Sequence, residues 1–121
     1  MEYVPEPLRE RTKAFALRIV KLFRALPAST DAQVLGKQLL RSGTSIAANY
    51  RAACRARSRV EFASKLGIVL EEADESVLWL ELLGESGIVR PELLAHLLDE
   101  AQQLTAIFTV ARRTAKSKPA V

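Results

Sequence analysis

The chain has almost none of the side chains from which catalytic and metal sites are built. Cys54 is its single cysteine and His96 its single histidine. One cysteine excludes a disulfide within the chain and is typical of a protein of the reducing cytoplasm. One Cys and one His argue against a zinc site or a Cys–His dyad within one subunit. Glycine-rich phosphate motifs are missing as well, so the sequence predicts neither an enzyme nor a cofactor.

Long apolar runs, glycine and proline are also scarce. No run of about 18 apolar residues occurs, which predicts a protein that does not span a membrane. The first residues, MEYVPEPLRE, lack the apolar stretch of a signal peptide, so we expect a cytoplasmic location. Only five Gly and five Pro interrupt the chain, which leaves room for long helices.

What is present is a repeated helical pattern of apolar side chains. An apolar content of 49% excludes general disorder, and 121 residues are enough for one domain with a single core. Apolar residues recur at spacings of three and four in four segments. We predict helices near 7–26, 31–56, 59–84 and 91–114, with a frayed tail at 115–121. Short connections favour an all-α, antiparallel up-down-up-down four-helix bundle.

Local capping motifs mark the joints between these helices. Ser58 and Glu61 have the spacing of a capping box at the start of the third helix. Pro91 suits the first position of the fourth, and Gly84 or Gly87 suits the end of the third.

Polar residues on the second and third helices predict a layer between them. If these helices form a hairpin that turns near residue 57, the numbers of facing residues sum to about 115. The predicted members of the layer are Arg41, Ser45, Asn49, Glu71 and Asp74. The layer either fixes the pairing and register of the two helices or forms a small polar pocket.

Positive charge is concentrated in the first half of the chain. Residues 1–59 carry 12 Lys/Arg and 4 Asp/Glu, whereas residues 60–121 carry 6 and 10, which gives net charges of +8 and −4. Four arginines cluster near the predicted hairpin turn: Arg51, Arg55, Arg57 and Arg59. They suit phosphate contact, and three of them would share a face if the helix continued. Alternatively, they complement a helix C-terminus, pair with acids of another subunit or bind a protein partner.

The third helix ends with more apolar surface than one bundle core can bury. A bundle helix normally buries one stripe, but here only Glu81 is polar between residues 77 and 83. The surplus predicts a homo-oligomer with an interface at Val77, Leu78, Trp79 and Leu82.

These segments together resemble a known family. The resemblance runs through residues 10 to 112 and is strongest in QLLRS at 38–42, TSIAANY at 44–50, EF at 61–62, LEEADE at 70–75 and WLELL at 79–83. On these motifs the chain is similar to the 23S rRNA intervening-sequence protein family. Many members continue after the position of Asn49 with Ile-Ala-Glu-Gly, whereas this chain has Tyr50-Arg51-Ala52-Ala53, which places it in a different branch.

The resemblance implies an antiparallel four-helix bundle that assembles into a ring of five. Members of the family resemble the accessory protein of diversity-generating retroelements, which is pentameric and basic and binds nucleic acid and a reverse transcriptase. The family provides no catalytic residues to transfer. We therefore expect a non-catalytic oligomeric scaffold whose basic edge contacts nucleic acid without reading sequence. The alternative is a purely protein-binding oligomer with no nucleic-acid role.

Overall fold

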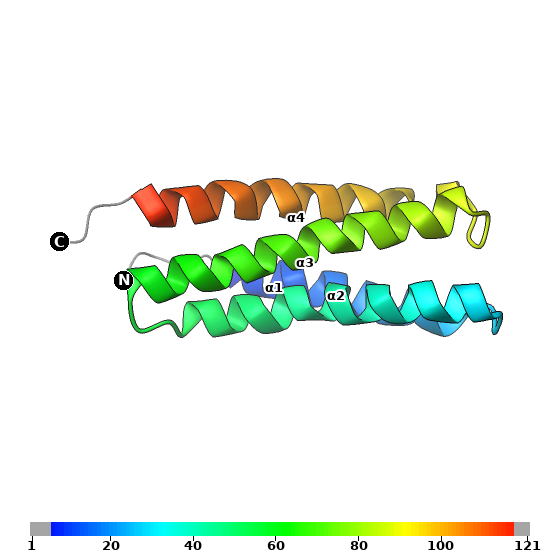
Figure 1. Ribbon diagram of the computed structural model, residues 1–121, viewed down its shortest axis with the longest axis horizontal. Coiled ribbons are helices and arrows are strands. Elements are labelled where there is room, and N and C mark those ends of the chain that lie inside the picture. The colour runs from blue at the N-terminus through cyan, green and yellow to red at the C-terminus, as the bar shows by residue number, and fades with distance from the viewer. Residues whose placement is uncertain (1–5, 118–121) are drawn as a thin grey trace.

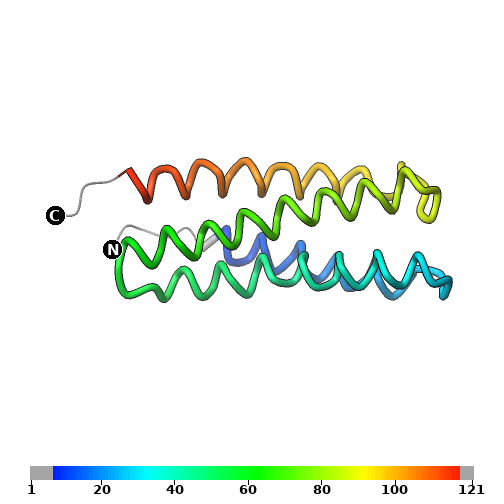
Figure 2. The backbone as a smooth tube through the Cα atoms, in the orientation of Figure 1, coloured from blue at the N-terminus to red at the C-terminus, as the bar shows by residue number. Residues whose placement is uncertain are grey.

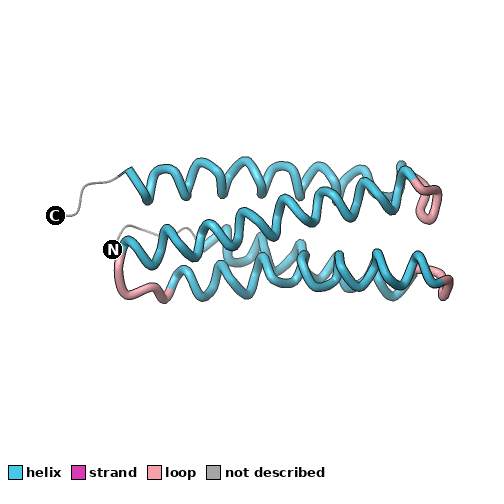
Figure 3. The backbone as a smooth tube through the Cα atoms, viewed as in Figure 1, coloured by secondary structure: helices cyan, strands magenta, loops and turns pink. Residues whose placement is uncertain are grey.

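Four long helices make up the regular structure of residues 6–117, the part of the chain that the computed structural model describes. They are α1 (Glu6–Ala25), α2 (Thr30–Cys54), α3 (Arg59–Glu85) and α4 (Pro91–Ser117). Consecutive helices run in opposite directions, and short loops join them at the two ends of the bundle (Figures 1 and 3). The predicted all-α antiparallel bundle is confirmed, and the predicted bounds agree to within three residues.

The C-terminal end of α4 is more ordered than predicted. Residues 115–117, assigned by the sequence to a frayed tail, belong to the helix. Ala115 is only 5% exposed because it packs against the core. This contact holds the last turn in place where the apolar periodicity has already faded. The rest of the predicted tail, residues 118–121, lies outside the described residues.

The four helices do not contact one another equally. α2 packs against α1 and α3, and α3 packs against α2 and α4, whereas α1 and α4 touch little. α1 has 20 residues, and the other three have 25 to 27. Figure 2 shows that α1 does not reach the end of the bundle where α2 turns into α3. At that end the other three helices extend beyond α1.

The core is continuous along the bundle and has an aromatic pair inside it. Tyr50 of α2 and Phe108 of α4 are almost completely buried, and their ring centroids lie 5.3 Å apart at an interplanar angle of 58°. A tilted pair at this distance is a favourable geometry for aromatic rings. The pair joins two helices that are not neighbours in the sequence.

The predicted caps form at two of the joints. The hydroxyl of Ser58 accepts a hydrogen bond from the backbone N–H of Glu61 at 3.0 Å. The carboxylate of Glu61 accepts from the N–H of Arg57 at 2.9 Å, one residue before the position expected for a capping box. At the other end of α3, the helix continues through Gly84, and Gly87 takes the left-handed conformation that a residue with a side chain rarely adopts.

A buried serine pair connects α2 and α3. The hydroxyls of Ser42 and Ser76 lie 2.8 Å apart, and both residues are fully buried. Ser76 also hydrogen-bonds the carbonyl of Glu72 within its own helix, at 2.9 Å. Because a buried hydroxyl without a partner is costly, this pair favours one register of the hairpin over its neighbours.

α2 and α1 approach closely at Gly43. A Cβ at this position would lie 2.9 Å from Cγ1 and 3.1 Å from Cγ2 of Ile19. Ile19 is fully buried, and its branched side chain has little room to move. The lack of a side chain at residue 43 is therefore required by the packing of α1.

Replacing Gly43 with alanine should destabilise the protein although alanine favours helix. Alanine gains about 1 kcal/mol of helix propensity, but overpacking of a core costs about 1–3 kcal/mol. We expect a net loss of up to about 2 kcal/mol in urea unfolding. Gly84→Ala is the matched control, because its Cβ would only reach ordinary contact, 3.4 Å from Leu94. A Gly43→Ala protein as stable as the Gly84→Ala protein would contradict this packing.

The serine pair should behave as a coupled unit. Ser42→Ala and Ser76→Ala each leave a buried hydroxyl with fewer partners, so each should lower the free energy of unfolding by about 1 kcal/mol. The double variant should lose less than the sum, because neither orphaned hydroxyl remains. A double-mutant cycle in urea measures the difference. Strict additivity would show that the two hydroxyls do not interact.

Candidate functional site

The predicted polar layer between α2 and α3 forms at Arg41 but with other partners. Its guanidinium lies 3.0 Å from the carboxylate of Glu72 and 2.5 Å from that of Glu75. Glu71 and Asp74, the predicted partners, are exposed. The hairpin register places positions 72 and 75 toward α2, which turns 71 and 74 outward. The expected partner residues were therefore wrong by one position on the helix.

This layer fixes helix pairing and adds little to stability. The hydrogen bond to Glu75 raises the pKa of Arg41; partial burial opposes the shift, and Glu72 adds to it. About half of the Arg41 side chain is exposed, and such pairs contribute about 0–1 kcal/mol. Asn49, also predicted in the layer, donates to the carbonyl of Ser45 within α2 at 2.9 Å. These contacts favour the register-fixing interpretation over a polar pocket.

A second ion pair closes the seam between α1 and α4. Arg11 contacts both carboxylate oxygens of Glu100, at 2.7 and 2.9 Å, and the amide oxygen of Gln103 at 2.6 Å. The hydrogen bond to Glu100 raises the pKa of Arg11, and burial opposes this shift. Sequence reasoning missed this contact because the partners lie 89 residues apart. Only the bundle topology brings them together.

The predicted arginine cluster lies around the α2–α3 turn. Arg51 is in the last turn of α2, Arg55 is its C-cap, and Arg59 is the first residue of α3. Since α2 ends at Cys54, the three side chains do not share one helical face as expected for a continuous helix. Arg51, Arg55 and Arg57 are exposed, and Arg59 is partly exposed.

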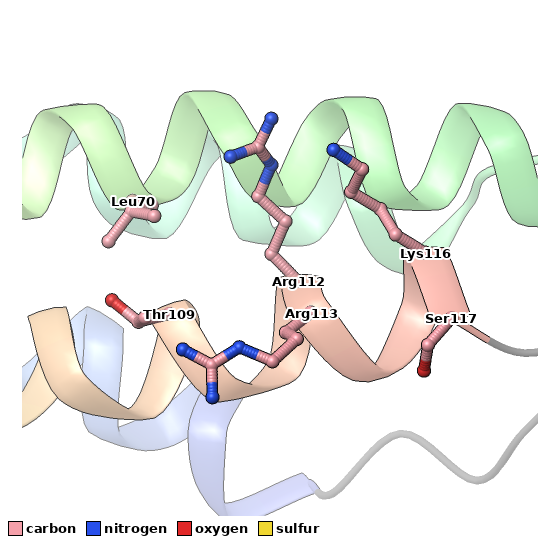
Figure 4. Close-up of a pocket in the computed structure, with 6 residues that line it drawn as sticks. All are labelled: Leu70, Thr109, Arg112, Arg113, Lys116 and Ser117. Atoms are coloured by element: carbon pink, nitrogen blue, oxygen red, sulfur yellow. The ribbon is translucent and has the colours of Figure 1, made fainter.

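Three further cations reach the same end of the molecule from α4. Arg112, Arg113 and Lys116 line a groove of about 400 Å³ between α3 and α4 (Figure 4). A neighbouring groove of about 460 Å³ is lined by Arg59 together with Arg112 and Lys116. These residues of α4 belong to the half of the chain whose net charge is negative, so the net charge of each half does not reveal them. The predicted antiparallel pairing of α3 and α4 does indicate their position, because it places the end of α4 beside the start of α3.

Seven cations lie at the end of the bundle where α2 turns into α3 and where α4 ends, and we call this region the basic end: Arg51, Arg55, Arg57, Arg59, Arg112, Arg113 and Lys116. Within residues 7–117, no carboxylate forms an ion pair with any of them. The C-termini of α2 and α4 both lie here, and their helix dipoles favour positive charge. These dipoles favour the cations of α2 and α4, whereas Arg57 and Arg59 lie at the N-terminus of α3, whose dipole disfavours positive charge. The absence of carboxylate partners leaves their hydrogen-bond donors available to an anion.

The predicted oligomer interface is only partly exposed. Leu78 and Leu82 are 46% and 38% exposed, respectively. Val77 and Trp79 are partly buried and pack against the core of their own subunit. The reason is that α3 contacts both α2 and α4 and so buries two stripes. The surplus apolar surface is smaller than the sequence indicates.

The aromatic and metal-ligating side chains form no binding site within the described chain. Tyr50 is buried against Phe108, so its ring is not available to stack on a nucleobase. His96 is exposed. Residues 6–117 contain no group of three or more His, Cys, Asp or Glu placed to hold a metal ion. None of the helices in this range has the length and apolar character of a membrane span.

Two comparisons with known proteins agree with the resemblance. The model of the 23S rRNA-intervening sequence protein family matches residues 8–109. A crystal structure of a protein of unknown function from the S23 ribosomal protein family of Bacteroides thetaiotaomicron superposes with a TM-score of 0.81. It is 36% identical, and the match covers 87% of this chain and 97% of that one. No curated protein matches. The motifs, the four-helix bundle and these matches show that the chain belongs to the 23S rRNA-intervening sequence protein family.

Proposed function

We propose that this protein is a non-catalytic homo-oligomeric scaffold whose basic end contacts nucleic acid without reading its sequence. The observation that carries the proposal is the gathering of seven cations at one end of the bundle, without a carboxylate partner in residues 7–117. Arginine and lysine on such a surface neutralise backbone phosphates, which every nucleic acid offers. The family name, which refers to an intervening sequence of 23S rRNA, fits a nucleic-acid context.

Sequence-specific readout does not fit this surface. The basic end consists of two helix C-termini, a turn and the first turn of α3, and none of these is a free helix that could enter the major groove. Its cations would instead contact phosphates, which position a protein but carry no sequence information. Buried Tyr50 and partly buried Trp79 offer no stacking platform.

Self-association would multiply these contacts. Leu78 and Leu82 are exposed on α3. A neighbouring subunit that packs here would bury both leucines. A cyclic arrangement repeats the basic end once per subunit. The order of five comes from the resemblance alone.

The rival function is a protein-binding scaffold with no nucleic-acid role. In that case the arginines of the turn would bind acids of a neighbouring subunit, such as exposed Glu71 and Asp74. The two functions differ in what holds the oligomer together. Apolar contacts do so in the first and arginine–carboxylate pairs do so in the second.

The first prediction concerns assembly. Sedimentation equilibrium at micromolar concentration should report a multiple of the 13.4 kDa chain, with five as the expected order. Leu78→Gln combined with Leu82→Gln should lower the mass, because it removes exposed apolar surface from the interface. Leu93→Gln is the matched control, since Leu93 is 64% exposed on α4. A monomeric wild type would contradict the scaffold.

The second prediction concerns nucleic acid. The wild type should bind a labelled oligonucleotide at about 50 mM salt, and binding should weaken steeply as salt rises. Arg51→Gln combined with Arg55→Gln should weaken binding equally for unrelated sequences and leave the oligomer intact. Arg24→Gln is the control, because Arg24 is an exposed arginine in the last turn of α1, at the opposite end of the bundle from the basic end (Figure 1).

Two results would decide for the rival. One is a wild type that fails to bind at this salt concentration. The other is dissociation of the Arg51/Arg55 double variant into monomers, which would show that these arginines hold subunits together. Sequence-dependent affinity would instead contradict the absence of base readout.

A further inference from the structure

Arg112 is a partly buried arginine for which residues 7–117 provide no carboxylate partner. Its Nε atom is buried and has no hydrogen-bond partner within residues 6–117. The side chain leaves α4 and extends across to α3 (Figure 4). A Cβ on Gly67 of α3 would lie 3.1 Å from this Nε and 3.5 Å from Cζ. The glycine therefore provides a slot in which the guanidinium rests.

Two arginines that cross between helices and bind carboxylates show what is unusual here. Arg11 crosses from α1 to α4 and binds Glu100, and Arg41 crosses from α2 to α3 and binds Glu72 and Glu75. Arg112 crosses from α4 to α3 in the same manner but meets no carboxylate in residues 7–117. Its Nε is shielded from solvent, so an external acceptor would bind the terminal nitrogens of the guanidinium instead.

Lys116 strengthens the local positive field. It lies one helical turn after Arg112, and Figure 4 shows its side chain also extending toward α3. Like charges at this spacing on one helix repel each other. An anion that binds both would turn this repulsion into two favourable contacts. The arrangement is thus more favourable with an anion present than without one.

Among residues 7–117, the lining of the two grooves contains cationic donors and no acidic side chain. Arg112 and Lys116 line both grooves between α3 and α4, and Arg113 adds a cation on one side and Arg59 on the other. Ser64 adds a hydroxyl to the lining, whereas the hydroxyls of Thr109 and Ser117 already donate to the carbonyls of Thr105 and Thr114 within α4. A phosphate group, which carries negative charge and several acceptor oxygens, matches this set of donors.

We propose that these two grooves form a phosphate-binding site, with Arg112 and Lys116 as its main contacts and Gly67 as the residue that positions Arg112. Because the guanidinium is already held in its slot, little side-chain freedom is lost on binding. The source of the phosphate that fits two adjoining grooves is the backbone of a nucleic-acid strand, in which successive phosphates are linked. This source rests on the proposed function, whereas phosphate binding itself does not.

The first measurement uses inorganic pyrophosphate and no nucleic acid. It should raise the melting temperature of the wild type above that in chloride of equal ionic strength. Arg112→Met combined with Lys116→Gln should abolish this rise, and the methionine keeps an apolar stem over α3. Arg41→Gln is the matched control, because it removes a crossing arginine that already has its own partners. Gly67→Ala leaves the net charge unchanged but should weaken pyrophosphate binding, because it displaces the Arg112 guanidinium. If Arg112 acted through its charge alone, this substitution would have no effect.

The second measurement uses a labelled single-stranded oligonucleotide. The Arg112/Lys116 double variant should bind about tenfold more weakly, as expected when charge-assisted hydrogen bonds are removed. The slope of log affinity against log salt should fall by about 0.7 for each phosphate that the variant no longer neutralises. The Arg51/Arg55 variant is measured in parallel, so that weakening at the turn and weakening at the grooves are separate results.

Each outcome supports or overturns the site. Equal stabilisation of wild type and double variant by pyrophosphate would overturn it, whatever the oligonucleotide does. If oligonucleotide binding depends on Arg51 and Arg55 alone, the proposed function stands, but the claim that the grooves bind the phosphates of the strand is overturned. Selective pyrophosphate binding with an unchanged oligonucleotide slope would keep the phosphate site and contradict the nucleic-acid source. Displacement of pyrophosphate by a glutamate-rich peptide but not by the oligonucleotide would overturn that source in favour of an acidic protein segment. If the double variant does not fold, the same measurements on Lys116→Gln alone test the site, because Lys116 is exposed and its replacement should not impair folding.

Discussion

The close approach of α2 and α3 is the constraint on which the other features depend. The two helices meet through buried hydroxyls at Ser42 and Ser76, 2.8 Å apart, with Arg41 bridging to α3 beside them. This contact sets the register of the hairpin, because a shift by one residue would bury polar groups without partners. The register in turn decides that positions 72 and 75 face inward and 71 and 74 outward. It also fixes where the α2–α3 turn lies, and with it the arginines of the basic end.

Much of the fold could be predicted from the sequence because its determinants are local. Apolar periodicity, the Ser58–Glu61 cap and Pro91 each depend on residues within a few positions of one another, and all three hold in the structure. The partners of Arg41 could be predicted only approximately. An error of one residue in an assumed hairpin register is enough to exchange Glu71 for Glu72, since neighbouring helical positions point about 100° apart.

The parts of the site that the sequence hid depend on long-range topology. Arg112 and Lys116 lie in the acidic half of the chain, yet the reversal between α3 and α4 returns them to the basic end. The net charge of a sequence segment cannot show this, because antiparallel helices bring residues from distant segments to the same level along the bundle axis. The same reversal partly buries Val77 and Trp79 within the subunit, since α3 packs against two helices. Counting one buried stripe per helix therefore overestimated the apolar surplus.

Ion pairs are distributed unevenly along the bundle, and the difference between its parts has a physical consequence. Away from the basic end, the crossing arginines are neutralised within the chain, at Arg11 by Glu100 and at Arg41 by Glu72 and Glu75. At the basic end, the donors of Arg112 face no described carboxylate. The unpartnered Nε costs free energy with or without a ligand, because an anion cannot reach an atom that is shielded from solvent. The terminal nitrogens of Arg112 are the donors that an anion can reach, and an anion that binds only the folded state stabilises that state by mass action.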